Sequence, residues 1–238
     1  MNDYEENVLK ELIVWKGKMK KKPSFSSGIT KGLQTKMNNL FPGKVQKFIT
    51  DSIRTMVKPV LVGSEYTSKQ PLTNVSLEQR ETLAKEKINF YRNIATASGA
   101  GTGASGLLVG LTDFPILLSL KVKLLFDLAS IYGFDVRDYK ERLYILYVFQ
   151  LAFSSDKRRV EIYGQISNWD NYVKDLPMDV NSFDWKTFQE EYRDYIDLAK
   201  MLQLVPGIGL AVGAYANYKL INKLGETAIN AYRLRIFK

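Results

Sequence analysis

Three observations predict an all-α fold, organised as a single multi-helix domain. Apolar residues recur every three or four positions in most segments, which is the period of an amphipathic helix. No stretch shows a convincing alternation of polar and apolar residues, so no half-buried strand is predicted. Two glycine-rich segments, each interrupted by a proline, lie within residues 98–134 and 204–215. We expect these two proline-broken helical segments to pack at the centre of the domain.

The first predicted helix is amphipathic and ends in a lysine-rich stretch before Pro23. Its apolar stripe consists of Tyr4, Val8, Leu12, Trp15 and Met19. The lysines near its end are Lys16, Lys18, Lys20, Lys21 and Lys22. They are either a solvated helix end that suits the negative end of the helix dipole, or a contact for anionic lipid headgroups worth about 1 kcal/mol per lysine. Nucleic acid is not expected as a partner, because no recognisable binding module accompanies the lysines.

The net charge of +9 is concentrated in the N-terminal third of the chain. Residues 1–75 hold 13 Lys/Arg against 6 Asp/Glu, whereas the charges of residues 76–238 nearly balance. The Ser-, Gly- and Lys-rich residues 23–40 are the best candidate for a linker. We therefore expect a basic amphipathic helix at 1–22, a polar linker at 23–40 and a helical domain at 41–238.

The domain should begin with two helices that have recognisable boundaries. The first is opened by Pro42 and closed by Gly63, and a second polar connection follows it. The next helix starts at Ser76, which with Gln79 has the spacing of a capping box.

The central glycine-rich stretch is predicted to be two helices that meet at a bend. Pro115 disfavours a helical conformation at the residue before it, and Asp113 is placed to cap the second helix, which Gly133 should close. A second glycine-rich segment follows Pro206. Glycines at helical spacing allow close approach of another helix, and they are Gly99, Gly103, Gly106, Gly110, Gly209 and Gly213.

The pattern Gly101-Thr-Gly103-Ala-Ser-Gly106 also matches the dinucleotide-binding pattern, with Asp127 downstream as the acidic residue. That fingerprint requires a buried strand before its first glycine. Here the preceding residues have helical spacing, so the glycines are interpreted as a packing device and no cofactor is predicted.

The second half of the chain should contain four more helices. The first three open near Asp138, Asp156 and Asp184, and the fourth follows the Pro206 segment and runs to the C-terminal residues. The helix that opens at Asp156 is expected to reach about Leu176. The last helix should place Leu220, Ile221, Leu224, Ala228 and Tyr232 inward. The core should include Phe126, Leu146, Trp185, Tyr192 and Tyr232.

The residue inventory excludes most enzyme mechanisms. The chain has no cysteine and no histidine, which removes thiolate chemistry, Ser-His-Asp arrangements and the usual zinc sites. Carboxylate, lysine or tyrosine chemistry, a Ser-Lys pair or an all-oxygen metal site remain, and no metal site is assigned. The candidates for carboxylate chemistry are Asp113 and Arg142, although a carboxylate two residues before a proline is more often a helix cap.

Several blocks in a fixed order resemble the EcsC family of bacterial proteins, and the resemblance covers nearly the whole chain. The blocks are Ser98-Gly-Ala-Gly-Thr-Gly-Ala, Asp113-Phe-Pro115, Tyr132-Gly-Phe-Asp135, Glu141-Arg142, Asp184-Trp185, Val205-Pro-Gly-Ile-Gly-Leu-Ala-Val-Gly213 and Asn230-Ala-Tyr-Arg-Leu-Arg235. The resemblance implies a bacterial protein encoded beside an ABC transporter. It implies no biochemical activity, cofactor or catalytic residue.

Together these observations predict a non-catalytic accessory protein at the inner face of the cell membrane. The expected partner is an anionic membrane surface or the subunits of a membrane transporter. The acidic start of the sequence lacks the order of a signal peptide, so a cytoplasmic location is expected. Two alternatives stay open: a hydrolase that uses carboxylate chemistry, and a helical interaction domain without membrane contact.

Overall fold

A computed structural model describes residues 1–21, 47, 51–55, 59–60, 70–102, 114–177 and 209–238. The described residues form helices and turns and contain no strand, which confirms the all-α prediction. The helices are α1 (Asp3–Lys20), α4 (Leu77–Thr102), α6 (Phe114–Ile131), α7 (Tyr139–Phe153), α8 (Asp156–Ser167), α9 (Trp169–Tyr172), the 3₁₀ helix η1 (Val173–Asp175) and α11 (Gly209–Ile236). Residues 51–55 and 59–60 are also helical, as expected for the helix after Pro42.

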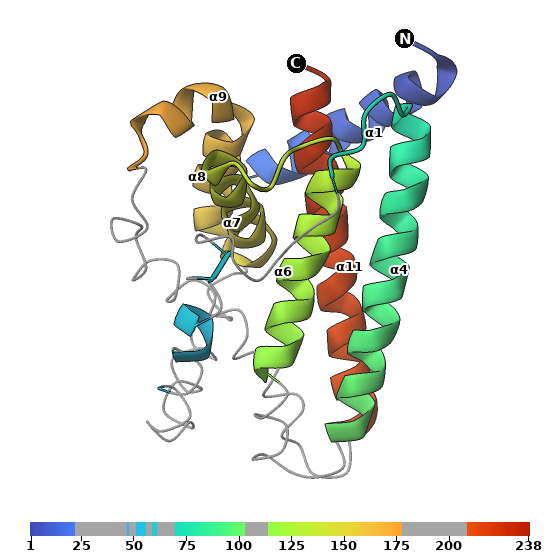
Figure 1. Ribbon diagram of the computed structural model, residues 1–238, viewed down its shortest axis with the longest axis vertical. Coiled ribbons are helices and arrows are strands. Elements are labelled where there is room, and N and C mark those ends of the chain that lie inside the picture. Colours follow the sequence, from blue (N-terminus) through green and yellow to red (C-terminus); the bar gives the residue numbers. More distant parts are fainter. Residues whose placement is uncertain (22–46, 48–50, 56–58, 61–69, 103–113, 178–208) are drawn as a thin grey trace.

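The three long helices α4, α6 and α11 pack against one another as a bundle (Figure 1). The chain runs down α4 and back up α6 and α11, so α4 is antiparallel to the other two (Figure 1). Helix α11 packs most extensively against α4 and also contacts α6 and α7. Helix α1 lies across the end of the bundle where α4 begins and α11 ends, in contact with α4, α8 and α11 (Figure 1).

Side-chain caps define where several helices begin. The predicted capping box of α4 is present, because the Gln79 backbone nitrogen donates to Ser76 Oγ at 3.3 Å and the Ser76 nitrogen donates to Gln79 Oε1 at 3.1 Å. Helix α1 has a second capping box, formed by Asn2 and Glu5. Asp138 caps α7 as predicted, by accepting a hydrogen bond from the Lys140 nitrogen at 2.9 Å.

The end of α6 depends on a glycine, as predicted. Gly133 has a φ of +91°, a left-handed conformation that side chains with a Cβ rarely adopt. The Phe134 nitrogen then donates to the Ala129 carbonyl oxygen at 2.9 Å, which satisfies a carbonyl group at the helix end. The chain can therefore reverse within a few residues and enter α7.

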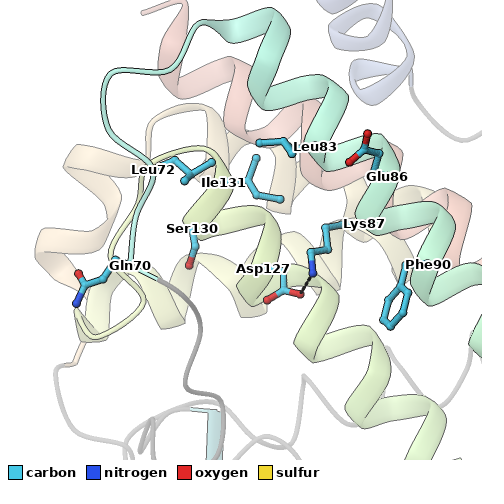
Figure 2. A pocket seen from close by; sticks show the side chains of 9 residues that line it. All are labelled: Gln70, Leu72, Leu83, Glu86, Lys87, Phe90, Asp127, Ser130 and Ile131. Carbon is cyan, nitrogen blue, oxygen red and sulfur yellow. Dashed lines mark ion pairs between the residues drawn. The ribbon is translucent and has the colours of Figure 1, made fainter.

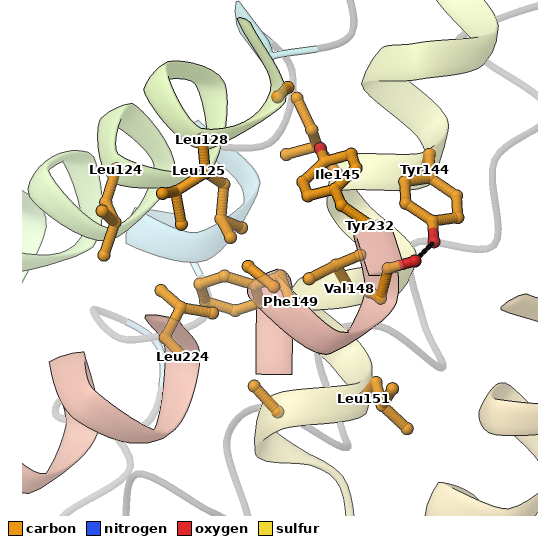
Figure 3. Packing of buried hydrophobic residues seen from close by; sticks show 14 of the residues in the cluster. Leu124, Leu125, Leu128, Tyr144, Ile145, Val148, Phe149, Leu151, Leu224 and Tyr232 are labelled. Atoms are coloured by element: carbon orange, nitrogen blue, oxygen red, sulfur yellow. Dashed lines mark hydrogen bonds between the residues drawn. The ribbon is translucent and has the colours of Figure 1, made fainter. Parts of the chain in front are cut away.

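The core lies where α6, α7 and α11 meet (Figure 3). The predicted core residues Phe126, Leu146 and Tyr232 are fully buried, and the predicted inward face of α11 is buried along its length. The buried Tyr144 donates a hydrogen bond to the Ala231 carbonyl oxygen at 2.7 Å (Figure 3). The other two predicted core residues, Trp185 and Tyr192, lie outside the described residues, as does the helix expected after Asp184.

The helix expected from Asp156 to about Leu176 is interrupted. Helix α8 ends at Ser167, and Asn168 leaves the helical conformation with φ −120° and ψ 38°. The interruption lets the buried Trp169 pack its ring against Tyr144 and Tyr147, with centroid separations of 5.0 and 5.3 Å. Burial of a large aromatic ring outweighs the local preference for a continuous helix here.

Candidate functional site

The first candidate site is the exposed side of α1, which combines lysines with apolar residues. Ile13 and Val14 are 59% and 61% exposed and lie next to each other on this helix. Lys10, Lys18, Lys20 and Lys21 are exposed around them, whereas Lys16 is half-buried. We call Lys10, Ile13, Val14, Lys18, Lys20 and Lys21 the α1 outer face. Lys22 lies outside the described residues.

Another side of α1 is fixed to the bundle, and Val14 and Lys18 lie at its edge, in a hollow that Lys85 and Ile88 also line. Val8, Leu12 and Trp15 are buried as the sequence predicted, and the Trp15 ring meets the Tyr163 ring edge-on at 5.8 Å between centroids. The Arg159 guanidinium of α8 donates to the Lys21 carbonyl oxygen at 3.1 Å. The α1 outer face is thus presented on a helix that is held in place along its length.

A buried ion pair also anchors α1 to α4 and α11. The Glu81 side chain is completely buried and accepts two hydrogen bonds from the Arg233 guanidinium, each 2.7 Å long. The Tyr4 hydroxyl donates to Glu81 Oε2 at 2.8 Å, and Arg233 Nη1 donates to Glu11 Oε2 at 3.0 Å. Burial, followed by the hydrogen bond to Glu81, raises the pKa of Tyr4 above its usual range, so this hydroxyl remains a donor at neutral pH.

The second candidate site is a cavity of about 340 Å³ between α4, α6 and the segment that precedes α4 (Figure 2). Its lining residues are Gln70, Leu72, Leu83, Glu86, Lys87, Phe90, Asp127, Ser130 and Ile131. We call it the α4–α6 cavity. Its volume lies within the range of small-molecule sites in proteins.

The wall formed by residues 70–75 is held by Arg80. Its guanidinium donates to the carbonyl oxygens of Leu72, Val75 and Ile131, over 2.9, 3.1 and 2.6 Å. The Leu72 nitrogen also donates to the Ser130 carbonyl oxygen at 2.9 Å. These bonds fix the wall of the α4–α6 cavity to both helices.

Asp127 is the central polar group of the α4–α6 cavity. Its Oδ2 accepts a hydrogen bond from the Tyr91 hydroxyl at 2.8 Å and lies 3.6 Å from Lys87 Nζ (Figure 2). Burial, and then the bond to Asp127, raises the pKa of Tyr91 above its usual range. One helical turn further along α6, the buried Ser130 Oγ has no hydrogen-bond partner.

Of the two residues predicted for carboxylate chemistry, only Arg142 lies among the described residues. Arg142 Nη1 donates to the carbonyl oxygens of Val136 and Arg137, at 3.0 and 2.6 Å, and so holds the turn before α7. Burial lowers the pKa of Arg142. Asp113 lies outside the described residues, so its pairing with Arg142 stays a prediction.

The predicted glycine contact is only partly within the described chain. Gly99 lies in α4, and Gly209 and Gly213 lie in α11, whereas Gly103, Gly106 and Gly110 fall outside. Gly101 lies in the last turn of α4, so the dinucleotide-like pattern follows a helix and lacks the strand that it needs. A close approach of α4 and α11 does occur at Gly225, where an added Cβ would lie 2.5 Å from Ile88 Cδ1.

Sequence reasoning missed both the α4–α6 cavity and the Glu81–Arg233 pair. Asp127 drew notice only as part of the dinucleotide pattern, and the 152 residues that separate Glu81 from Arg233 left no local pattern to find. The sequence did offer one indication, because Glu81 and Arg233 occupy helix positions where apolar residues recur every three or four residues.

Two properties of the described residues concern membranes and metals. No helix among these residues is both long and apolar enough to cross a bilayer. No group of three acidic side chains within the same residues is arranged to hold a metal ion.

Comparison with known proteins identifies the family. Residues 6–237 match the model of the EcsC protein family. The chain is 46% identical to Protein EcsC of Bacillus subtilis (strain 168) over 232 residues, covering 97% of this chain and 95% of that protein. It is 32% identical to the Uncharacterized protein YdbA of the same organism over 172 residues, covering 71% of this chain and 62% of that protein. No solved structure matches it. Because the family model spans nearly all of its helical elements, the chain belongs to the EcsC protein family.

Proposed function

We propose that this protein is a non-catalytic accessory protein that binds the anionic cytoplasmic face of the cell membrane through the α1 outer face. The observation that carries the proposal is the exposure of Ile13 and Val14 among four exposed lysines on one packed helix. A membrane transporter subunit is the proposed protein partner, on the ground of the family resemblance.

The lysines and the exposed apolar residues of the α1 outer face should both contribute to membrane binding. Each lysine near an anionic bilayer contributes about 1 kcal/mol, so the four lysines supply roughly 4 kcal/mol. Ile13 and Val14 can then enter the region between headgroups and acyl chains, as the apolar residues of interfacial helices do. The bundle need not unfold, because Val8, Leu12 and Trp15 stay in the core on the other side of α1.

The proposal is tested by sedimentation with vesicles of phosphatidylcholine alone or with phosphatidylglycerol added. We expect binding only to the anionic vesicles, and we expect added salt to weaken it because salt screens exposed charges. A variant with Lys10, Lys18, Lys20 and Lys21 all changed to Gln should lose this binding. Ile13→Ser with Val14→Ser should weaken it while leaving its salt dependence intact.

A matched variant controls for net charge. Lys123, Lys140, Lys174 and Lys219 are exposed on other helices, and changing all four to Gln removes the same charge from elsewhere on the surface. This variant should sediment with anionic vesicles nearly as well as the parent protein. Equal binding by both lysine variants would refute a specific role of the α1 outer face. Failure of the parent protein to sediment with anionic vesicles would favour an interaction domain without membrane contact.

A further inference from the structure

We propose that the α4–α6 cavity binds a small organic ammonium ion, that is, a protonated primary amine carried on an apolar body. Helix α1 contributes no residue to this cavity, so the inference is independent of the proposed membrane contact.

Unused hydrogen-bond acceptors favour a ligand that brings donors. Asp127 Oδ2 is already engaged by Tyr91 and Lys87, whereas Asp127 Oδ1 has no hydrogen bond among the described residues. Ser130 Oγ is buried and unpartnered on the same face of α6, one helical turn from Asp127 (Figure 2). A buried polar group without a partner costs free energy, which a bound donor would recover. An ammonium group offers three N–H donors to these acceptors.

The charge balance selects a cation over an anion. Asp127 and Glu86 contribute two negative charges to the lining and Lys87 one positive charge. Lys87 and Asp127 lie 3.6 Å apart and compensate each other, so the exposed Glu86 leaves the lining with a net charge of −1, which favours a cationic ligand.

The remaining walls favour an apolar ligand body. Leu72, Leu83, Phe90 and Ile131 line the cavity, and Phe90 and Leu83 are 55% and 39% exposed. A chain of a few methylene groups or one aromatic ring would cover them, gaining the free energy of apolar burial. The face of Phe90 also suits a cation, since Lys87 Nζ already lies 5.7 Å from its ring centroid.

Isothermal titration calorimetry with the full chain tests the inference. The probes are hexylammonium, hexanol and hexanoate, which share one apolar chain and differ in charge. We expect hexylammonium to bind about ten-fold or more tightly than either of the others, because only it can donate to Asp127 and Ser130 with a compensating charge. A leucine dipeptide amide is titrated next, once with a free amino terminus and once with an acetylated one. This comparison distinguishes a small amine from a peptide amino terminus as the source of the ammonium group.

Two single substitutions locate the site. Asp127→Asn keeps the shape of the side chain and removes its charge, and should weaken hexylammonium binding by about ten- to a hundred-fold. Ser130→Ala should weaken it by a smaller factor. Asp175→Asn and Ser119→Ala change exposed residues away from the cavity and should leave binding unchanged.

A third substitution guards against loss of folding. Leu83→Trp fills the cavity from a partly exposed position, so the fold should persist while hexylammonium binding is lost. Equal binding of the three hexyl compounds, or hexylammonium binding that survives both Asp127→Asn and Leu83→Trp, would overturn the assignment.

Discussion

The side-chain amide nitrogen of Asn217 in α11 donates a hydrogen bond to the backbone carbonyl oxygen of Ala95 in α4, over 3.0 Å in a buried environment. This bond links the final third of α4 to the first third of α11, close to the glycine-rich ends of both helices. It therefore fixes how the two longest helices are aligned along their shared interface.

Replacing Asn217 should destabilise the protein in a way that depends on the new group. Asn217→Ala removes a buried hydrogen bond and should cost about 1 to 3 kcal/mol in urea unfolding. Asn217→Asp should cost more at pH 7, because a carboxylate would face a carbonyl oxygen, and the excess should shrink at pH 4 when a protonated carboxyl can donate. Asn89→Ala, at an exposed position of α4, is the control and should change stability little.

Gly225 should not tolerate alanine, although it lies inside a helix. Alanine normally gains about 1 kcal/mol over glycine in a helix interior. At Gly225 the new Cβ would lie 2.5 Å from Ile88 Cδ1 and 3.1 Å from Ile88 Cγ2, so we expect net destabilisation by about 1 to 2 kcal/mol in thermal unfolding. Shortening the neighbour in Gly225→Ala with Ile88→Val should recover part of the loss.

Gly164 and Gly17 supply the matched controls for this substitution. Nothing lies within 4 Å of a Cβ added at either position, and both residues are inside helices. Gly164→Ala and Gly17→Ala should therefore raise the melting temperature. A rise for Gly225→Ala as well would show that α4 and α11 have room to separate at Ile88.

The Glu81–Arg233 pair should be far more costly to break than to replace. Arg233→Met alone leaves the buried Glu81 carboxylate without a counter-charge and should cost about 3 to 5 kcal/mol in urea unfolding. Glu81→Leu alone should cost less, because Arg233 keeps its ion pair with Glu11. The double substitution should cost less than the sum of the two. Glu161→Gln, which removes the partly exposed ion pair with Arg158, should cost less than about 1 kcal/mol. Additive single and double costs would show that the two charges do not interact.

The free energy of unfolding should increase as the pH rises above 8, because the buried Lys121 then loses its proton in the folded protein. Burial lowers the pKa of this lysine to about 8, with the side chain beside the Phe153 ring at 5.6 Å. Between that value and the ordinary lysine pKa the unfolded chain binds more protons than the folded one, so stability increases with pH, by roughly 3 kcal/mol in full.

Urea unfolding of the parent and of Lys121→Met between pH 7 and pH 9.5 measures this contribution. The variant should be more stable at pH 7, and the advantage should shrink as the parent loses the proton from Lys121. Comparing the two proteins at each pH cancels the effect of the buried tyrosines, which titrate above this range. A constant difference between them would show that Lys121 stays charged in the folded protein.

Periodic patterns in the sequence predicted the helices well because each pattern repeats within a single element. The stripe from Val8 to Trp15 predicted the buried side of α1, and Ser76 with Gln79 predicted the start of α4. The inward residues of α11, from Leu220 to Tyr232, are buried as expected. Local spacing and capping chemistry suffice for such features.

The features that sequence reasoning missed depend on residues that are distant in the chain. The α4–α6 cavity joins Leu83 and Phe90 to Asp127 and Ser130, and only the packing of α4 on α6 brings these side chains together. Gly225 was missed because a single glycine has no repeat, and its role depends on Ile88 of another helix. The break at Asn168 likewise follows from the burial of Trp169, a tertiary effect.

The two arginines near the end of α11 have a consequence for synthesis on the ribosome. Glu81 and Glu141 are made early, yet their buried partners are Arg233 and Arg235, and Arg235 lies against the Phe134 ring at 3.7 Å from its centroid. A nascent chain that has emerged through α7 therefore holds two carboxylates for which burial is unfavourable. Closure of the bundle therefore requires the final turns of α11, which bring Arg233 and Arg235 against these two carboxylates.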